Sequence, residues 1–239
     1  MKATTELVVR VDDVGRSRLH RVSCEVPLLF RTAQVDGDEL ALSWVNGAAG
    51  PLGGDRLRLH LTVDEGACVR IRSTGASMVQ PDPASSASTF DILITLAAGA
   101  SLDWWPEPTV SVRGSRHRTS MHVDAHPSAS ARIVESVVLG RHGEPPGRLA
   151  LHQRIVIDGT PVLDQELAFG ELALAGPGAH GASRAVLAAV TLGDAYRPDP
   201  RVIVSPDAVA AVFALDRGAM LVTAAADDQR TLAGLALLG

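Results

Sequence analysis

Hydrophobic and polar residues alternate strictly over several stretches in the first two-thirds of the chain. In residues 56–63, one face carries Leu57, Leu59, Leu61 and Val63, and the other carries Arg56, Arg58, His60 and Thr62. Residues 89–96 repeat the pattern, with Phe90, Ile92, Ile94 and Leu96 on one face. Alternation with a period of two is typical of a β-strand with one buried face. The sequence therefore predicts a strand at each stretch.

A third alternating stretch covers residues 149–157. Its apolar positions are Leu149, Leu151, Ile155 and Ile157, and Gln153 breaks the alternation. The β-branched content is high in these stretches, which favours a pleated sheet over a helix. We expect a strand here too, interrupted by one polar side chain.

A faint repeat recurs about every 30 residues. Residues 63–69 (VDEGACV) resemble residues 96–102 (LAAGASL), and residues 123–129 (VDAHPSA) form a looser third copy. Each copy reads as a strand end, a short turn, a small residue and a new strand. A repeat of this length is typical of a solenoid, in which each turn covers its neighbour. Three hairpin turns in an antiparallel sandwich would give the same pattern, and the periodicity favours neither fold.

The character of the chain changes after the flexible-looking stretch 175–182. Ser205-Pro206-Asp207 predicts a helix start, with Ser205 as N-cap and Pro206 at the first helical position. Asp227 and Asp228 precede an apolar run that ends at Leu238 and predict a second helix. With no long linker, we expect a single domain over residues 1–239. It would have a β-rich body over about 1–174 and a shorter α-containing tail over about 175–239.

Composition narrows the function classes. The net charge of −5 argues against a general nucleic-acid binder, which would carry a basic stripe. No signal-peptide core follows Met1, and no apolar run reaches the length of a membrane span. We therefore expect a cytoplasmic protein that does not bind membranes. Cys24 and Cys68 have no zinc-type spacing, so two reduced, partly buried thiols are expected.

Motifs for catalysis are absent from the sequence. It has no G-x-x-x-x-G-K-[ST] loop and no G-x-S-x-G elbow, so we expect no enzyme activity and assign no catalytic residue. His122 and His126 are four residues apart in or near an expected strand. At that spacing they lie about 13 Å apart, too far to share one ion. No permanently bound cofactor is expected.

Two carboxylates stand in unusual positions. Asp55 follows Gly53 and Gly54 at the start of a strand, and Glu135 lies inside the apolar stretch 133–139. Burying a carboxylate is costly unless it is hydrogen-bonded, paired or bound to a cation. Asp55 is either a turn residue that caps backbone amides or a cation-binding group. Glu135 either faces outward, pairs with an arginine such as Arg141, or binds a cation.

These segments resemble one protein family in several places. The stretches that carry the resemblance are 50–57 (GPLGGDRL), 65–67 with 73–77, 102–108 (LDWWPEP), 135–141 and 154–161 (RIVIDGTP). Each resembles a motif of the UreD (also UreH) urease accessory proteins. They occur in the family's order, within residues 26–170.

The resemblance implies a mainly β protein with a β-helix-like, solenoid-type body and a small helical C-terminal part. It implies a non-catalytic scaffold that binds UreF and, through UreF, the GTPase UreG, and that docks on apo-urease. Nickel would pass through an internal tunnel in transit to urease. By motif position, Asp55 and Glu135 are the candidates to line that tunnel. Trp104, Trp105 and Pro106 are expected to pack between solenoid turns, or else to form a partner-binding patch.

Two other function classes are compatible with a β-solenoid. A hydrolase acting on a polysaccharide would need paired acids in a groove with aromatic platforms, and aromatic residues are only 3% of this chain. A divergent assembly or interaction protein without a metal-transfer role would need only surfaces. The sequence leaves this last alternative open.

Overall fold

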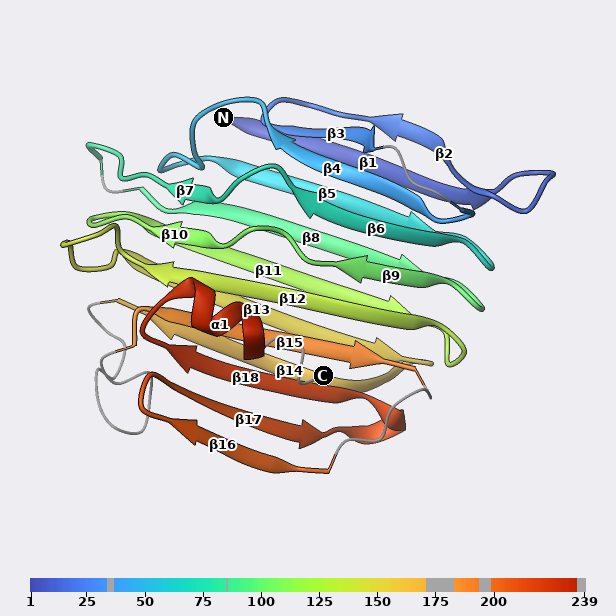
Figure 1. Ribbon diagram of the computed structural model, residues 1–239. Helices are drawn as coiled ribbons and strands as arrows, with labels where there is room; N and C mark the ends of the chain where they lie inside the picture. Colours follow the sequence, from blue (N-terminus) through green and yellow to red (C-terminus); the bar gives the residue numbers. More distant parts are fainter. Residues whose placement is uncertain (34–36, 85, 171–182, 194–198, 236–239) are drawn as a thin grey trace.

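The computed structural model describes residues 1–33, 37–84, 86–170, 183–193 and 199–235. In this part of the chain the protein is mainly β, wound into a solenoid of about four turns with one short C-terminal helix (Figure 1). The expected fold class is therefore confirmed. The boundary predicted near residues 174 and 175 lies outside the described residues.

The first of two sheets, sheet A, has the strand order β14-β13-β11-β8-β5-β1-β2 within the described residues. Its strands are β1 (Lys2–Val11), β2 (Ser17–Ser23), β5 (Arg56–Val63), β8 (Ser88–Leu96), β11 (Arg116–Ala125), β13 (Arg148–Ile157) and β14 (Thr160–Phe169). The five strands β1, β5, β8, β11 and β13 are parallel. The outermost strands β2 and β14 pair antiparallel at the two edges.

The second sheet, sheet B, has the order β16-β17-β18-β15-β12-β9-β6-β4-β3 in the same part of the chain, with two short strands beside it. Its strands are β3 (Leu28–Ala33), β4 (Leu40–Asn46), β6 (Cys68–Ser73), β7 (Ser77–Val79), β9 (Ser101–Trp104), β10 (Thr109–Ser111), β12 (Ser130–Leu139), β15 (Ala185–Leu192), β16 (Arg201–Ser205), β17 (Ala208–Ala214) and β18 (Met220–Ala226). Strands β4, β6, β9 and β12 are parallel. Strands β15–β18 continue the sheet antiparallel.

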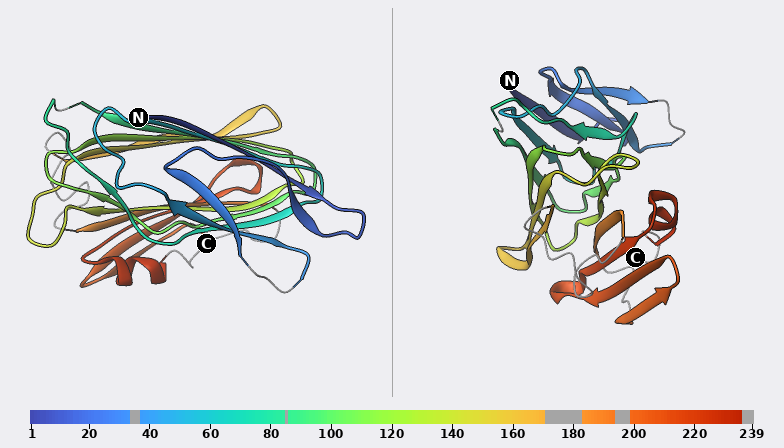
Figure 2. Two further views of the ribbon diagram at one scale, coloured as in Figure 1. Left: turned by 90° about the horizontal axis from the view of Figure 1, so that it is seen from above. Right: turned by 90° about the vertical axis from the view of Figure 1, so that its left-hand side faces the viewer.

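Parallel pairing decides between the solenoid and the sandwich. Each central strand of sheet A is followed by a strand of sheet B, and the chain then returns to sheet A beside the previous turn. Strand β8 pairs parallel with β5 from Arg56↔Thr89 to Val63↔Leu96. Parallel neighbours need such a crossover, whereas hairpins would give antiparallel pairs. Figure 2 shows the two layers that result.

The 30-residue repeat marks equivalent turns of the solenoid. In all three copies the backbone N–H of the small residue closes the turn: Ala67 donates to Asp64 O, Ala100 to Ala97 O and Ala129 to His126 O, at 3.0, 3.1 and 2.9 Å. Neighbouring turns are also bonded to each other, because Gly66 N donates to Ala98 O. The weak sequence similarity therefore reflects stacked turns.

The main core fills the space between the sheets. Its members are the inward residues of the alternating strands, and the largest fully buried side chains include Leu59, Ile92, Met121 and Trp104. Burial of one apolar face per strand is the main stabilising term for such a fold. The alternation predicted for residues 56–63, 89–96 and 149–157 is confirmed.

The helix predicted at Ser205 is wrong. Residues Arg201–Ser205 and Ala208–Ala214 form the hairpin β16–β17, in which Ser205 pairs with Ala208. Pro206 and Asp207 form its turn. Valines along both segments favour a strand, and the free edge of β18 supplies a partner for β17. Tertiary pairing outweighed a reasonable local helix signal.

The second C-terminal helix is confirmed as α1 (Gln229–Leu235). Asp228 caps it, because its Oδ1 accepts the backbone N–H of Thr231 at 2.8 Å. Leu232 is buried and Leu235 packs beside it, against the outer face of β15, β17 and β18. Among the described residues, no helix has both the length and the apolar character needed to cross a membrane.

Candidate functional site

Glu135 lies in the middle of β12 and points between the two sheets. It is 7% exposed, in a strand whose inward neighbours Ile133 and Val137 are fully buried. Its Oε2 accepts a hydrogen bond of 3.3 Å from Gln153 Nε2. Burial raises the pKa of Glu135 to about 7, and the hydrogen bond from Gln153 lowers it in part. A carboxylic acid that titrates near neutrality thus sits in the core.

Gln153 explains the break in the alternation of β13. It takes an inward position of sheet A, is 1% exposed, and faces Glu135 across the core. Its Oε1 accepts a 2.9 Å hydrogen bond from Gln165 Nε2 on β14. Sequence reasoning noted the irregularity at Gln153 but assigned it no role. A role could have been expected from the sequence: a glutamine at an inward position of a strand is buried, and a buried amide needs hydrogen-bond partners.

The suggested pairing of Glu135 with Arg141 is wrong, as is an outward orientation of Glu135. Arg141 lies beyond the end of β12, exposed, and forms an ion pair with Glu144 at 2.9 Å. Six residues of extended strand would span about 20 Å, so Arg141 is far from the middle of β12. Glu135 thus has an amide partner in place of a cation.

Asp55 serves as a turn residue directly before β5. Its Oδ2 accepts the backbone N–H of Leu52 at 2.9 Å, and its Oδ1 pairs with the amino group of Met1 at 2.6 Å. Gly53 packs so closely that an added Cβ would lie 2.7 Å from the carbonyl oxygen of Ser86. These contacts explain the glycine and the aspartate of this segment. A role of Asp55 in cation transfer stays a prediction.

The structure does not bring the two candidate carboxylates together as one site. Asp55 leads into sheet A and bonds to its own turn, whereas Glu135 belongs to sheet B and bonds to Gln153. Within the described residues, no group of three or more His, Cys, Asp and Glu side chains could hold a metal ion. The histidine pair behaves as predicted: His122 is in β11, while His126 lies in the next turn beside Ser128.

A second buried polar cluster was not predicted. His117 on β11 lies 2.8 Å from Ser88 Oγ through Nδ1 and 3.1 Å from Thr119 Oγ1 through Nε2. Burial lowers the pKa of His117 to about 4, so this imidazole is neutral near pH 7. A cavity of about 20 Å³ lies beside it, lined also by Trp44 and other residues. The sequence did contain a signal for this burial. His117 is six residues before Val123, so in an alternating strand the two side chains point to the same, inward face.

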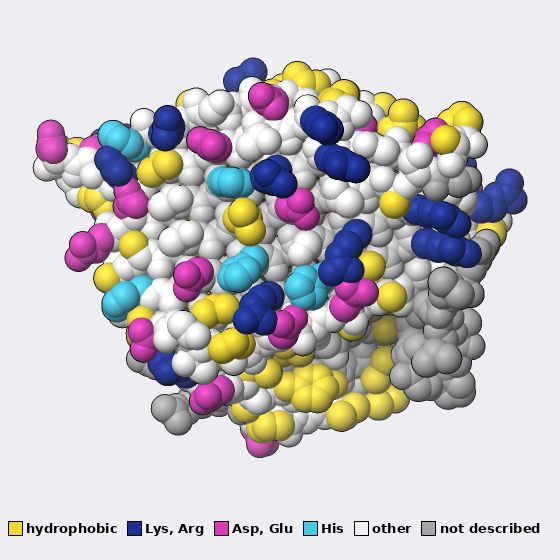
Figure 3. Space-filling model, turned by 180° about the vertical axis from the view of Figure 1, so that it is seen from behind, with side chains coloured by type: hydrophobic (Ala, Val, Ile, Leu, Met, Phe, Trp, Pro, Cys, Tyr) yellow, Lys and Arg dark blue, Asp and Glu magenta, His cyan; other side chains and the backbone are white. Residues whose placement is uncertain are grey.

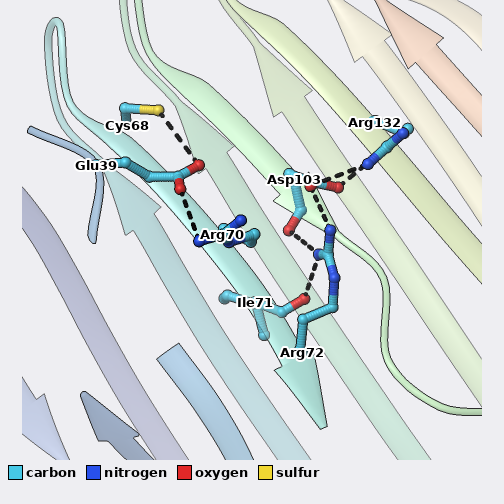
Figure 4. Close-up of polar contacts among 7 residues, drawn as sticks. All are labelled: Glu39, Cys68, Arg70, Ile71, Arg72, Asp103 and Arg132. Atoms are coloured by element: carbon cyan, nitrogen blue, oxygen red, sulfur yellow. Dashed lines mark hydrogen bonds and ion pairs between the residues drawn. The ribbon is translucent and has the colours of Figure 1, made fainter. Parts of the chain in front are cut away.

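The outer face of sheet B carries a charged network (Figure 4). Asp103 binds Arg72 and Arg132 together, with a 3.1 Å contact to Arg132 Nη2. Arg70 pairs with Glu39 at 3.2 Å beside Cys68. The two guanidinium groups hold the pKa of Asp103 below its usual range, although burial opposes them.

The two tryptophans of the sequence motif have different surroundings. Trp104 is in the core, 6.1 Å from the ring of Trp44 on β4, two strands away in sheet B, which confirms the expected packing role for this residue. Trp105 lies on the outer side, with the guanidinium carbons of Arg72 and Arg132 at 5.7 and 4.9 Å from its ring centre. Such cation–π contacts stabilise the outer face. The choice between packing and partner binding stays open for Trp105.

Cys68 and Cys24 are both free and partly buried, as expected. Burial raises the pKa of the Cys68 thiol. Its uncharged form is therefore favoured, which makes Cys68 a poor metal ligand.

Sheet B extends beyond sheet A at the C-terminal end. The inner face of β16 and β17 therefore lacks a covering layer among the described residues, and Val202 and Val204 are 69% and 76% exposed. A groove runs between β14 and β18, lined by Phe169, Val209 and other mostly apolar residues. In Figure 3, charged and histidine side chains are mixed over sheet A, and hydrophobic side chains gather below it.

The fold and these sites define a β-solenoid protein with a carboxylic acid at the centre of its core and an apolar sheet face on its surface. The chain belongs to the UreD urease accessory protein family. The sequence model of that family matches residues 1–236.

Several proteins of known family are similar along almost the whole chain. The urease accessory protein UreD of Streptomyces avermitilis is 36% identical over 231 residues, which are 95% of this chain and 92% of the relative. UreD 3 of Streptomyces griseus is 36% identical over 98% of this chain and 94% of the relative. UreD of Parafrankia sp. is 33% identical over 97% of this chain and 85% of the relative. These relatives are described as accessory proteins, in agreement with an accessory role.

Proposed function

We propose that this protein is a non-catalytic scaffold that helps deliver nickel to apo-urease in the cytoplasm. The observation that carries the proposal is the buried Glu135 in a UreD-family protein, a carboxylate that has no cationic partner among the residues that the structure describes. A buried carboxylate without a counter-charge is costly, and binding a cation in transit would offset that cost. Nickel is the cargo here, and no permanent cofactor is proposed.

The chemistry around Glu135 suits transfer better than storage. Nickel accepts oxygen ligands, and one carboxylate beside the neutral amide of Gln153 would bind a dication weakly. Several weak binding sites, one after another along a path, lower the energy barrier to ion movement without trapping the ion, as in channels. Asp55 is the second candidate on the path, although its oxygens are engaged by Leu52 and Met1.

The proposed partners are UreF, through it the GTPase UreG, and apo-urease. The uncovered face of β16 and β17 supports a protein-binding role, because exposed apolar patches often mark interaction sites. Nucleic acid and membranes are not proposed as partners.

Co-purification with UreF and UreG, followed by nickel transfer to apo-urease with GTP present, tests the proposal. Glu135→Gln is expected to leave the complex intact and to reduce nickel transfer at least tenfold. Asp124→Asn is the matched control, because Asp124 is an exposed carboxylate on β11. Nickel transfer that is unchanged by both Glu135→Gln and Asp55→Asn would exclude these residues from the path.

An interaction protein without a metal-transfer role is the second candidate. It is favoured by the apolar face and by the lack, among the described residues, of a cluster that could hold a metal ion. In that case the complex with UreF and UreG would form, and the wild-type protein, Glu135→Gln and Asp55→Asn would all activate urease equally. Failure to form any complex, with the chain shown to be folded by circular dichroism, would point to other partners.

A further inference from the structure

The outer face of sheet A carries exposed cations near the N-terminal ends of its parallel strands. The members of this basic patch are Lys2 on β1, Arg56 and Arg58 on β5, and Arg116 and Arg118 on β11. The strand registers place Lys2, Arg56 and Arg118 in one row across β1, β5, β8 and β11. At about 4.8 Å per strand, this row spans roughly 14 Å. In Figure 3, dark blue side chains gather toward the right-hand side of this face.

Much of the positive charge of the basic patch is not neutralised within the described part of the protein. Two of its five cations form ion pairs there: Arg118 with Glu166, and Arg58 with Asp91 at a long 3.9 Å. The other three have no ion-pair partner among the residues that the structure describes. Five cations and two carboxylates leave three positive charges in excess, in a chain whose net charge is −5. This end of sheet A is therefore positive although the protein as a whole is acidic.

The arrangement of these cations costs free energy in the isolated protein. Lys2 and Arg56 lie directly opposite each other on neighbouring strands, and like charges in such positions are destabilising. Arg116 and Arg118 are two residues apart and point to the same face of β11. A surface that carries carboxylates would relieve this repulsion and would be attracted to the patch from a distance. The patch therefore fits an acidic partner.

Other residues of the same face favour a protein over a nucleic acid as that partner. Asp91 and Glu166 lie among the cations and would repel a continuous row of phosphates, whereas a protein can place basic side chains opposite them. Leu93 is 43% exposed and lies between His60 and His122 in one row. An apolar contact bordered by charged residues is typical of protein interfaces.

We propose that the outer face of sheet A is a docking surface for an acidic face of a partner protein. The basic patch steers the approach of the partner, and Leu93 holds the complex together. This surface is separate from the uncovered face of β16 and β17, and the inference does not depend on nickel transfer. Charges at the rim of an interface act mainly on the association rate, whereas a contact buried in the complex acts mainly on the dissociation rate.

Charge reversal at two arginines of the patch tests the electrostatic part. Arg56→Glu with Arg116→Glu is expected to weaken binding of a labelled oligoglutamate peptide at low salt at least about tenfold, as measured by fluorescence anisotropy. The matched control is Arg31→Glu with Arg230→Glu, because both arginines are exposed and neither forms an ion pair with a described residue. The control changes the net charge equally and should weaken binding less than about threefold. Circular dichroism verifies that both double variants are folded.

Three outcomes of the peptide measurement would overturn the proposal. Equal weakening in both double variants would show an effect of net charge alone. Absence of binding by wild type would show that the patch does not attract carboxylates. Tighter binding of duplex DNA than of the peptide at the same salt concentration would show that phosphates are preferred to an acidic protein surface.

The UreF–UreG complex and apo-urease, each immobilised in turn, extend the test to whole proteins. Arg56→Glu with Arg116→Glu should lower the association rate of one of them and flatten its salt dependence, and Leu93→Ser should raise the dissociation rate. If wild type binds either protein and no variant changes the rates, the docking surface is wrong. If wild type binds neither, the proposed function is wrong, and the peptide measurement still decides the docking surface.

Discussion

Gln153 donates a hydrogen bond from Nε2 to Oε2 of Glu135 across the space between the two sheets, at 3.3 Å. The bond joins the middle of β13 to the middle of β12, where both side chains are almost fully buried. It places an acid and an amide in a core built mainly from apolar side chains. Several measurable properties of the protein depend on this and on related polar contacts.

The stability of the protein should depend on the charge of Glu135. The pKa of this residue is about 7 in the folded state, above the ordinary value of 4.5. The folded state therefore holds a proton that the unfolded state releases, and stability from this group is complete below pH 4.5 and is lost as pH rises through 7. The loss is about 3 kcal/mol in total. Urea unfolding between pH 4.5 and 8 should show this decline in wild type and a smaller one in Glu135→Gln.

His117 should produce the opposite trend. Its pKa is about 4 in the folded state, below the ordinary value of 6.5. Stability from this group is present above pH 6.5 and is lost as pH falls through 4, because the unfolded chain binds the proton more readily. His117→Gln should lose less stability than wild type between pH 7 and 4 in urea unfolding. An identical acid sensitivity of both proteins would contradict the burial of a neutral imidazole.

Asp55 should affect stability through its turn. Asp55→Ala leaves the backbone N–H of Leu52 without its acceptor and is expected to cost about 1–3 kcal/mol. Asp55→Asn keeps an oxygen for Leu52 and should cost less. Thermal unfolding of the two variants compares them. If both unfold like wild type, the turn contacts contribute little, and a functional reason for this aspartate gains weight.

Asp103 should hold the two arginines against Trp105. Asp103→Asn removes the shared charge, so Arg72 and Arg132 are expected to move and the fluorescence of Trp105 to change. The pairs are partly exposed, so the stability change should be only about 1 kcal/mol. Asp91→Asn is the control, because Asp91 makes a long, exposed contact with Arg58 at 3.9 Å. Emission that changes equally in both variants would argue against a specific Trp105 environment.

The uncovered sheet face should drive self-association of the isolated chain. Val202→Thr with Val204→Thr keeps the β-branched shape but removes exposed apolar surface. Light scattering should show less association, while the melting temperature stays close to that of wild type, since both sites are exposed. Val190→Thr, in the core, should instead destabilise the fold.

The strands were the most predictable part of the fold, for a local reason. Successive side chains of a strand point to opposite faces because of the backbone geometry alone. The alternating apolar residues in 56–63 and 89–96 therefore identified the buried face of each strand directly. The helix predicted at Ser205 failed because β17 found a partner in β18, a contact remote in sequence. The cap of α1 by Asp228 was predictable, because capping involves only the next three residues.

The sequence by itself determined the alternation of the strands, the repeated turns, the unusual positions of Asp55 and Glu135, and the family resemblance. Each of these features can be recognised within short stretches of sequence, without knowing which residues meet in the folded protein. Only the tertiary structure decided that the repeat stacks as parallel turns and that Glu135 faces Gln153 instead of Arg141. Strand pairing and contacts across a core join residues far apart in the chain, and which of them meet depends on the packing of the whole domain.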